Sequence, residues 1–214
     1  MLKLYSYFRS SASYRARIAL HWKNLPFEYI PVHLLKNGGE QRSAEYRKVN
    51  PMGHVPALVH NGFLVAETMA IVEYLDAVFP QNPLFPTVPH DRALVVQICE
   101  VVNSGIQPLQ NLKVQKWLEG MHGLSKASSD AFVKHWIEDG FANLERLLER
   151  TAGTHCFGGH VTAADCFVIP QVATARRFGI NLAQFPNISY VHDAAIQLPA
   201  FVKAQPDQQP DYQP

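Results

Sequence analysis

With 214 residues, 47% of them hydrophobic, and 19 basic against 18 acidic side chains, the chain is long enough for one compact unit or two small domains with a real core. A net charge of +1 without a basic run argues against a nucleic-acid partner, and three cysteines without a Cys-x-x-Cys pair argue against a disulfide framework. Neither a signal-peptide pattern nor an apolar stretch of transmembrane length is found, so we expect a cytoplasmic protein with no membrane partner.

The N-terminal third alternates between strand and helix patterns. The predicted strands are 2–5, 27–32, the end of 50–59, and 63–65. A helix follows the first strand, Asn61-Gly62 predicts a tight hairpin, and a second helix begins after Glu67-Thr68 and stops at Pro80. The order strand, helix, strand, hairpin, helix is the outline of a thioredoxin-like domain, in which Val55-Pro56 would hold a cis bond.

Small hydroxyl residues join the first strand to the first helix. The first N–H groups of a helix lack backbone partners and carry roughly half a positive charge, so Ser10 to Ser13 would favour a thiolate or carboxylate. The alternative is that such a serine only caps the helix. Tyr5 or Tyr7 could also hydrogen-bond a thiol, although both fit a packing role.

Four prolines within 80–89 mark a domain boundary, and the sequence beyond them is predicted to be helical. We therefore predict an α/β domain at 1–84 and an all-helical domain at 90–214. The segment 91–103 is apolar nearly all round, which indicates a helix that is buried or shared with a second subunit. Pro108 would kink or interrupt it.

The rest of the helical part contains structural signals. A core stripe at helical spacing is formed by Val133, Ile137, Phe141, Leu144 and Leu148. Thr162 and Asp165 have the spacing of a capping box, and Pro170 implies a kink inside a helix. The polar, proline-rich segment 205–214 is predicted to be extended and poorly ordered.

A metal site is not predicted. The residues that would suggest zinc are His155, Cys156, His160 and Cys166, but their spacing matches no common ligand set. The chain also lacks a nucleophile elbow, a Walker loop and a dinucleotide fingerprint.

Five motifs in order resemble the zeta class of cytosolic glutathione transferases, whose best-known activity is isomerisation of maleylacetoacetate. They lie at 8–20, 50–58, 106–112, 158–165 and 170–178, and the similarity continues to Gln209-Pro210-Asp211. The resemblance implies the cytosolic glutathione transferase fold, with a thioredoxin-like domain before a helical one, and a two-fold homodimer. It also implies glutathione as the cosubstrate and a small unsaturated keto or dicarboxylic acid as the substrate.

The same resemblance assigns roles within the site. Ser10 would activate the glutathione thiol, with Ser11 as the next candidate, and Arg9 and Arg176 would hold the substrate carboxylates. The residues that would bind glutathione besides Ser10 are Gln41, His54, Val55, Glu67, Thr68, Gln107 and Asn111. Among them Thr68 would cap the next helix, while Glu67 could equally be a surface residue and Asn111 a helix-end residue. Arg15 and Arg17 are predicted to be structural ion-pair residues.

Two positions depart from the class pattern. Ala12 stands where a cysteine is usual, which puts any chemistry of that thiol in doubt, and Glu67 replaces the more usual glutamine. Addition and elimination of glutathione need only the serine. Besides the isomerase, the resemblance leaves open an isomerase of maleylpyruvate, a glutathione-dependent transferase or dehalogenase of α-halo acids, and a non-catalytic glutathione-binding protein.

Overall fold

The computed structural model describes residues 1–213, and the chain divides into two compact units. Unit 1 contains Met1–Leu84 together with the residues from Ile196 onward, and unit 2 is Phe85–Ala195. Within the described residues, no helix has the length and apolarity needed to cross a bilayer. The sequence assigned all of 90–214 to the helical domain, whereas the chain from Ile196 belongs to unit 1.

Unit 1 is built on a mixed four-stranded sheet with strand order β2-β1-β3-β4. The strands are β1 (Leu2–Ser6), β2 (Phe27–Pro31), β3 (Ala57–His60) and β4 (Phe63–Ala66). Strand β1 runs parallel to β2 and antiparallel to β3, which pairs antiparallel with β4. The hairpin between β3 and β4 turns through Asn61 and Gly62, whose φ angles of 51° and 87° suit a tight turn, as predicted.

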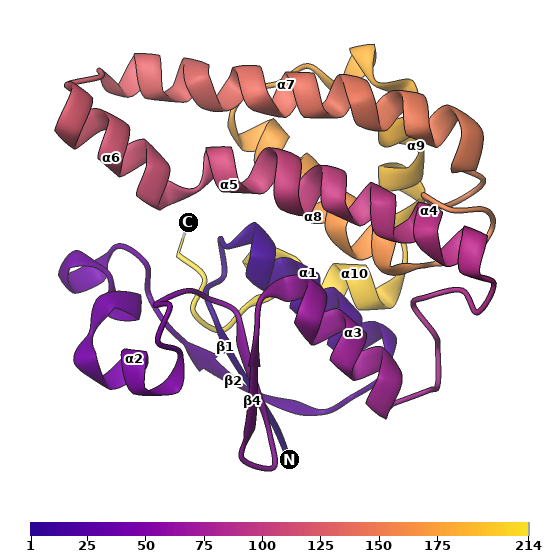
Figure 1. The fold of residues 1–214 in the computed structure, drawn as a ribbon, viewed down its shortest axis with the longest axis horizontal. Coiled ribbons are helices and arrows are strands. Elements are labelled where there is room, and N and C mark those ends of the chain that lie inside the picture. Colours follow the sequence, from indigo (N-terminus) through magenta and orange to yellow (C-terminus); the bar gives the residue numbers. More distant parts are fainter. Residues whose placement is uncertain (214) are drawn as a thin grey trace. The chain divides into compact units, whose positions relative to one another are not determined.

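The helices of unit 1 are α1 (Ser11–Trp22), α2 (Ala44–Val49), α3 (Thr68–Val78) and α10 (Pro199–Ala204). Helix α1 packs against both α3 and α10, and Figure 1 shows the yellow α10 beside the indigo α1. All residues from Ser13 to Leu20 are buried, and α3 and α10 both pack against this helix. The short helix α2 was not predicted from the sequence.

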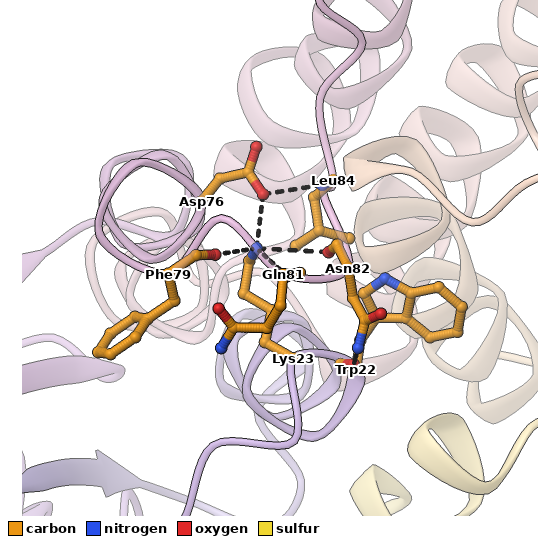
Figure 2. Close-up of polar contacts among 7 residues, drawn as sticks. All are labelled: Trp22, Lys23, Asp76, Phe79, Gln81, Asn82 and Leu84. Atoms are coloured by element: carbon orange, nitrogen blue, oxygen red, sulfur yellow. Dashed lines mark hydrogen bonds and ion pairs between the residues drawn. The ribbon is translucent and has the colours of Figure 1, made fainter.

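Lys23, at the C-terminal end of α1, holds the segment that follows α3. Its fully buried ammonium lies 2.7 Å from Asp76 Oδ1 and donates to the carbonyls of Phe79, Gln81 and Asn82 at 2.8, 3.1 and 3.3 Å (Figure 2). Asp76 also accepts from the Leu84 N–H at 2.8 Å. A buried charge needs partners of this kind, so this contact set fixes the chain between α3 and Leu84.

Unit 2 is helical. Its elements are α4 (Pro89–Glu100), a π-helical segment (Val101–Ile106), α5 (Gln107–Gln110), α6 (Leu112–His122), α7 (Lys126–Thr151), α8 (Ala163–Arg177) and α9 (Pro186–Ala195). The predicted interruption near Pro108 takes the form of the π-helical segment and the short α5. The predicted stripe of α7 is buried throughout.

Helix α8 lies in the middle of unit 2 and is mostly buried. The predicted capping box is confirmed: the Asp165 carboxylate accepts from the Thr162 N–H at 2.8 Å and from the Cys156 N–H at 2.9 Å. Asp165 thereby ties the start of α8 to the loop after α7, while Pro170 lies inside the helix, as predicted.

The prediction of a poorly ordered C-terminus is wrong for the described residues. A 3₁₀ turn, Pro206–Gln208, follows α10, and Gln209 is buried. The Gln209 side-chain amide donates to the carbonyls of Lys203 and Gln205 at 2.9 and 2.7 Å. A polar, proline-rich composition therefore does not prevent order here, because side-chain amides satisfy the backbone locally.

Candidate active site

The strand register brings three parts of unit 1 to one edge of the sheet. Tyr5 in β1 pairs with Ala57 in β3, and Ala57 pairs with Ala66 in β4. Beyond these paired residues, β1 continues through Ser6 towards Ser10. At the same edge, Val55-Pro56 immediately precede β3 and Glu67 immediately follows β4. Helices α1 and α3 both begin at this edge, so two positive helix ends lie beside it. We call it the site edge.

Ser10 ends a turn, residues 7–10, in which its N–H donates to the Tyr7 carbonyl at 3.0 Å. We call these four residues the Ser10 turn. Ser10 is the N-cap of α1, and its Oγ accepts from the Ser13 N–H at 3.1 Å. Because this bond uses a lone pair of the hydroxyl, the O–H hydrogen can still donate to an anion. Capping and thiolate activation are therefore compatible roles.

The Ser10 turn sits on a buried base. The side chains of Tyr7 and Phe8 belong to an apolar cluster with Val32, Tyr46 and Val55, and their rings meet edge to face at 4.7 Å. This cluster gives Tyr7 a packing role. Tyr5 is partly buried against Tyr46.

Arg17 holds the same turn from α1, which the sequence did not predict. Its guanidinium is buried, and among the described residues it donates to the carbonyls of Tyr7, Phe8 and Ala204 at 3.3, 3.1 and 2.9 Å, and to Ser6 Oγ at 3.3 Å. The expected ion-pair role is replaced by backbone recognition. Burial lowers the pKa of Arg17 to about 10, so it remains a cation at neutral pH.

The loop before β3 is held by its own hydrogen bonds. The carbonyl of His54 accepts from the Tyr46 hydroxyl at 2.7 Å and from the Asn50 side chain at 2.8 Å. Val55 is buried and the Val55–Pro56 bond is cis, the isomer that a thioredoxin-like domain would hold there. Gln41 is also buried and donates to the Leu34 carbonyl at 3.4 Å, while its Oε1 finds no partner within the described residues.

The start of α3 differs from the prediction. Glu67 is the N-cap, with φ of 69° and no side-chain cap hydrogen bond, and Thr68 is the first helical residue. Thr68 therefore does not cap α3, because the chain turns into the helix one residue earlier. The exposed Glu67 carboxylate lies 3.8 Å from His54 Nδ1. With its side chain directed elsewhere, the first N–H groups of α3 suit a carboxylate ligand.

The remaining predicted residues differ in exposure. Arg9 is exposed on the Ser10 turn, and Ser11 and Ala12 are half-buried in the first turn of α1. Across the described residues, no three His, Cys, Asp or Glu side chains are grouped as a metal site requires.

Three predicted residues lie in unit 2. Gln107 begins α5, and Asn111 is the N-cap of α6, where its Oδ1 accepts from the Lys113 N–H at 3.0 Å. Arg176 is half-exposed in the last turn of α8, with Nη2 3.4 Å from His192 Nδ1 and 3.8 Å from Asp193 Oδ1. Its neighbour Arg177 is also exposed and lies over the Phe178 ring at 5.4 Å.

Comparisons with known proteins place this geometry in context. The family profile for the glutathione S-transferase N-terminal domain matches residues 1–77. The chain is 42% identical over 211 residues to a maleylacetoacetate isomerase of Dictyostelium discoideum, which covers 99% of this chain and 96% of that protein.

Two solved structures are also similar. A bacterial maleyl pyruvate isomerase, described as a zeta-class glutathione S-transferase, superposes with a TM-score of 0.95 at 36% identity, over 99% of this chain and all of that one. A maleylacetoacetate isomerase of Anaeromyxobacter dehalogenans, with glutathione bound in its active site, gives 0.89 at 38% identity, over 99% and 97% of the two chains.

Proposed function

The chain belongs to the zeta class of glutathione transferases, and on that basis we propose that it is a glutathione-dependent isomerase that converts maleylacetoacetate to fumarylacetoacetate. The observation that carries the proposal is the site edge, where a serine with a donor hydrogen caps one helix beside the open start of another. When bound, glutathione supplies the thiolate that adds to the cis double bond and leaves once the bond has rotated.

Ser10 keeps the sulfur in its anionic form. A thiol with a pKa of ~8.5 is only a few per cent ionised at neutral pH. The Ser10 hydroxyl donates to the thiolate, and the positive end of α1 adds to its stabilisation. Together they lower the thiol pKa by ~2 units, which is ~2.7 kcal/mol of preference for the anion.

The other residues of the site edge bind the remaining groups of the tripeptide. The first N–H groups of α3 receive the γ-glutamyl carboxylate, and the Glu67 carboxylate attracts its ammonium. The Val55 backbone pairs with the cysteinyl unit as an added strand. Gln41 and His54 lie towards the glycyl end, with the Gln41 Oε1 as an available acceptor. For Gln107 and Asn111, both in unit 2, a role in binding glutathione is implied by the resemblance alone.

The resemblance assigns the carboxylates of the acid substrate to two guanidinium groups, one in each unit. Arg9 and Arg176 are both exposed enough to meet a ligand, and a guanidinium fork matches a carboxylate in geometry. They also stabilise the negative charge that develops on the substrate during addition. Glutathione and a small unsaturated keto acid are therefore the ligands of this chain.

The proposal is tested by the rate of maleylacetoacetate isomerisation with and without glutathione. The assay is run beside maleylpyruvate, since the superposition with a maleyl pyruvate isomerase makes that acid the second candidate. Turnover that requires glutathione supports the proposal, and the ratio of the two rates names the preferred substrate. If neither acid is turned over, the isomerase function is wrong, and α-halo acid dehalogenation or glutathione binding alone comes next.

We also propose that the protein is a cytoplasmic homodimer. Helix α4 buries Val95, Ile98 and Cys99 within unit 2, yet it leaves Leu94 38% exposed. A single exposed leucine is ordinary on the surface of a monomer, so the proposal of a dimer rests on membership of the zeta class. Light scattering after size-exclusion chromatography tests this, and a monomer mass would contradict it.

A further inference from the structure

The C-terminal segment reaches the Ser10 turn through one carboxylate. Asp211 Oδ2 accepts from the Phe8 N–H at 3.1 Å, a contact between residues 203 positions apart in the chain. Asp211 Oδ1 accepts from the Tyr29 hydroxyl of β2 at 2.6 Å. Both carboxylate oxygens are thus used, one on the turn and one on the sheet below it.

The segment that carries Asp211 is itself fixed. The Gln209 amide ties it to the carbonyls of Lys203 and Gln205, and the Tyr212 ring meets the Phe8 ring edge to face at 5.5 Å. Asp211 therefore does not depend on a loose chain end for its position.

Arg17 acts on the same peptide groups with the opposite charge. It donates to the Tyr7 and Phe8 carbonyls, while Asp211 accepts from the Phe8 N–H between them. Hydrogen bonds to a charged partner are shorter and roughly twice as strong as neutral ones. The turn before Ser10 is consequently held on its donor side by an anion and on its acceptor side by a cation.

We propose that Asp211 is a positioning residue for catalysis: through the Phe8 N–H it fixes the Ser10 turn, so that the Ser10 hydroxyl and the first N–H groups of α1 face the glutathione sulfur. This inference rests on the proposed function. Asp211 does not touch the reacting atoms and acts through Phe8. The segment 209–213, which lies within the part of the chain that the sequence predicts to be poorly ordered, then belongs to the catalytic apparatus.

The test is to replace Asp211 in the full chain and to measure the thiol pKa of bound glutathione from its ultraviolet thiolate absorbance. In Asp211→Ala the turn loses its anchor, and we expect the thiol pKa to rise by ~1 unit, with kcat at neutral pH ~10-fold lower. The KM for glutathione should change by about twofold or less, because the tripeptide contacts remain. In Asp211→Asn, which keeps an acceptor, we expect a smaller rise.

The sign of the shift separates positioning from simple charge. Removing a carboxylate near the sulfur would by Coulomb's law lower the thiol pKa, whereas loss of positioning raises it. The matched control is Asp207→Asn, which changes an exposed carboxylate in the preceding 3₁₀ turn and should leave the thiol pKa unchanged. An unchanged or lowered thiol pKa in Asp211→Ala, or in Asp211→Asn if the alanine variant does not fold, overturns the inference.

Failure of the proposed function gives a different result. Ser10→Ala is measured alongside: if it leaves the thiol pKa unchanged, Ser10 is not the activator and the proposed mechanism is wrong. The Asp211 variants still decide the present inference in that case, because the Ser10 turn also orients the N–H groups of α1. A rise of the thiol pKa in Asp211→Ala supports the positioning role of Asp211, whether the Ser10 hydroxyl or an N–H group of α1 donates to the sulfur.

Discussion

Two buried cations, Arg17 within α1 and Lys23 at its end, do similar work on two different segments. Lys23 contacts a carboxylate, Asp76, at 2.7 Å, and its backbone acceptors belong to the chain after α3. Arg17 donates to carbonyls of the Ser10 turn and to Ala204, and the anion that completes its contact set, Asp211, lies across the turn. Lys23 is paired directly with a carboxylate. Arg17 and its anion Asp211 instead contact the same backbone peptide groups, Arg17 at their carbonyls and Asp211 at an N–H.

This difference separates a stabilising contact from a positioning one. Loss of Lys23 would leave a carboxylate and several carbonyls without their cation, far along the chain from the serine. Loss of the Arg17 and Asp211 contacts would release the turn that presents Ser10. We therefore expect the Lys23 contacts to control the free energy of unfolding, and the Arg17 and Asp211 contacts to control the thiol pKa as well.

The largest effect is expected for Lys23→Met. Removing one partner of a buried ion pair leaves the other charge uncompensated and typically costs ~3–5 kcal/mol in the free energy of unfolding. Urea unfolding measures this, with Lys3→Met as the control, since the exposed Lys3–Glu28 pair should contribute only ~0–1 kcal/mol. A raised thiol pKa in folded Lys23→Met would show that the two contact sets are not separate.

Ser10→Ala should have the next largest effect, and on catalysis. Without the donor hydroxyl the thiol pKa returns towards its free value, and kcat should fall by about 100-fold at neutral pH. Affinity for glutathione, measured by calorimetry, should change little, because the γ-glutamyl and glycyl contacts remain. Ser11→Ala is the matched control; if it abolishes turnover while Ser10→Ala does not, Ser11 is the activator.

Arg176→Ala should raise the KM for the acid substrate by ~10-fold, the expected effect of losing one charged hydrogen-bonding partner, with a smaller change in kcat. The structure offers a competing role, since Arg176 lies near His192 and Asp193. Arg177→Ala is therefore measured beside it. An increase in KM for Arg177→Ala alone would move the assignment to the neighbouring residue.

The elements that the sequence predicts well are those whose signals are local. Alternating apolar residues and Asn61-Gly62 are sufficient for the strands and hairpin, and Thr162 with Asp165 is sufficient for the start of α8. Helix α2 has six residues and buries only Tyr46, so it presents too little periodicity to be recognised.

The errors arise where the structure depends on residues distant in sequence. Nothing local to Asp211 shows that it meets Phe8 and Tyr29, so the segment was predicted to be poorly ordered. The resemblance implies Thr68 as the cap of the next helix, but the left-handed backbone at Glu67 makes Glu67 the N-cap and Thr68 the first helical residue. The roles of Ser10, Arg9, Arg176 and the glutathione-binding residues stay predictions, although the strand register brings the chain next to Val55 and Glu67 to one edge of the sheet.

The smallest expected effect concerns His21, which lies on α1 between the two cations. Burial, followed by the nearby charges of Lys203 and Arg17, lowers the pKa of His21 below its usual value of 6.5. Below pH 6.5 the unfolded chain therefore binds a proton that the folded chain does not, so stability should fall as the pH falls from 6.5 towards the folded pKa. One such group contributes at most ~1.4 kcal/mol per pH unit. Urea midpoints at neutral and acidic pH should lie closer together in His21→Gln than in the parent protein. An unchanged difference between the two midpoints would mean that His21 has the same pKa in the folded and unfolded states. Neither its burial nor the charges of Lys203 and Arg17 would then affect its titration.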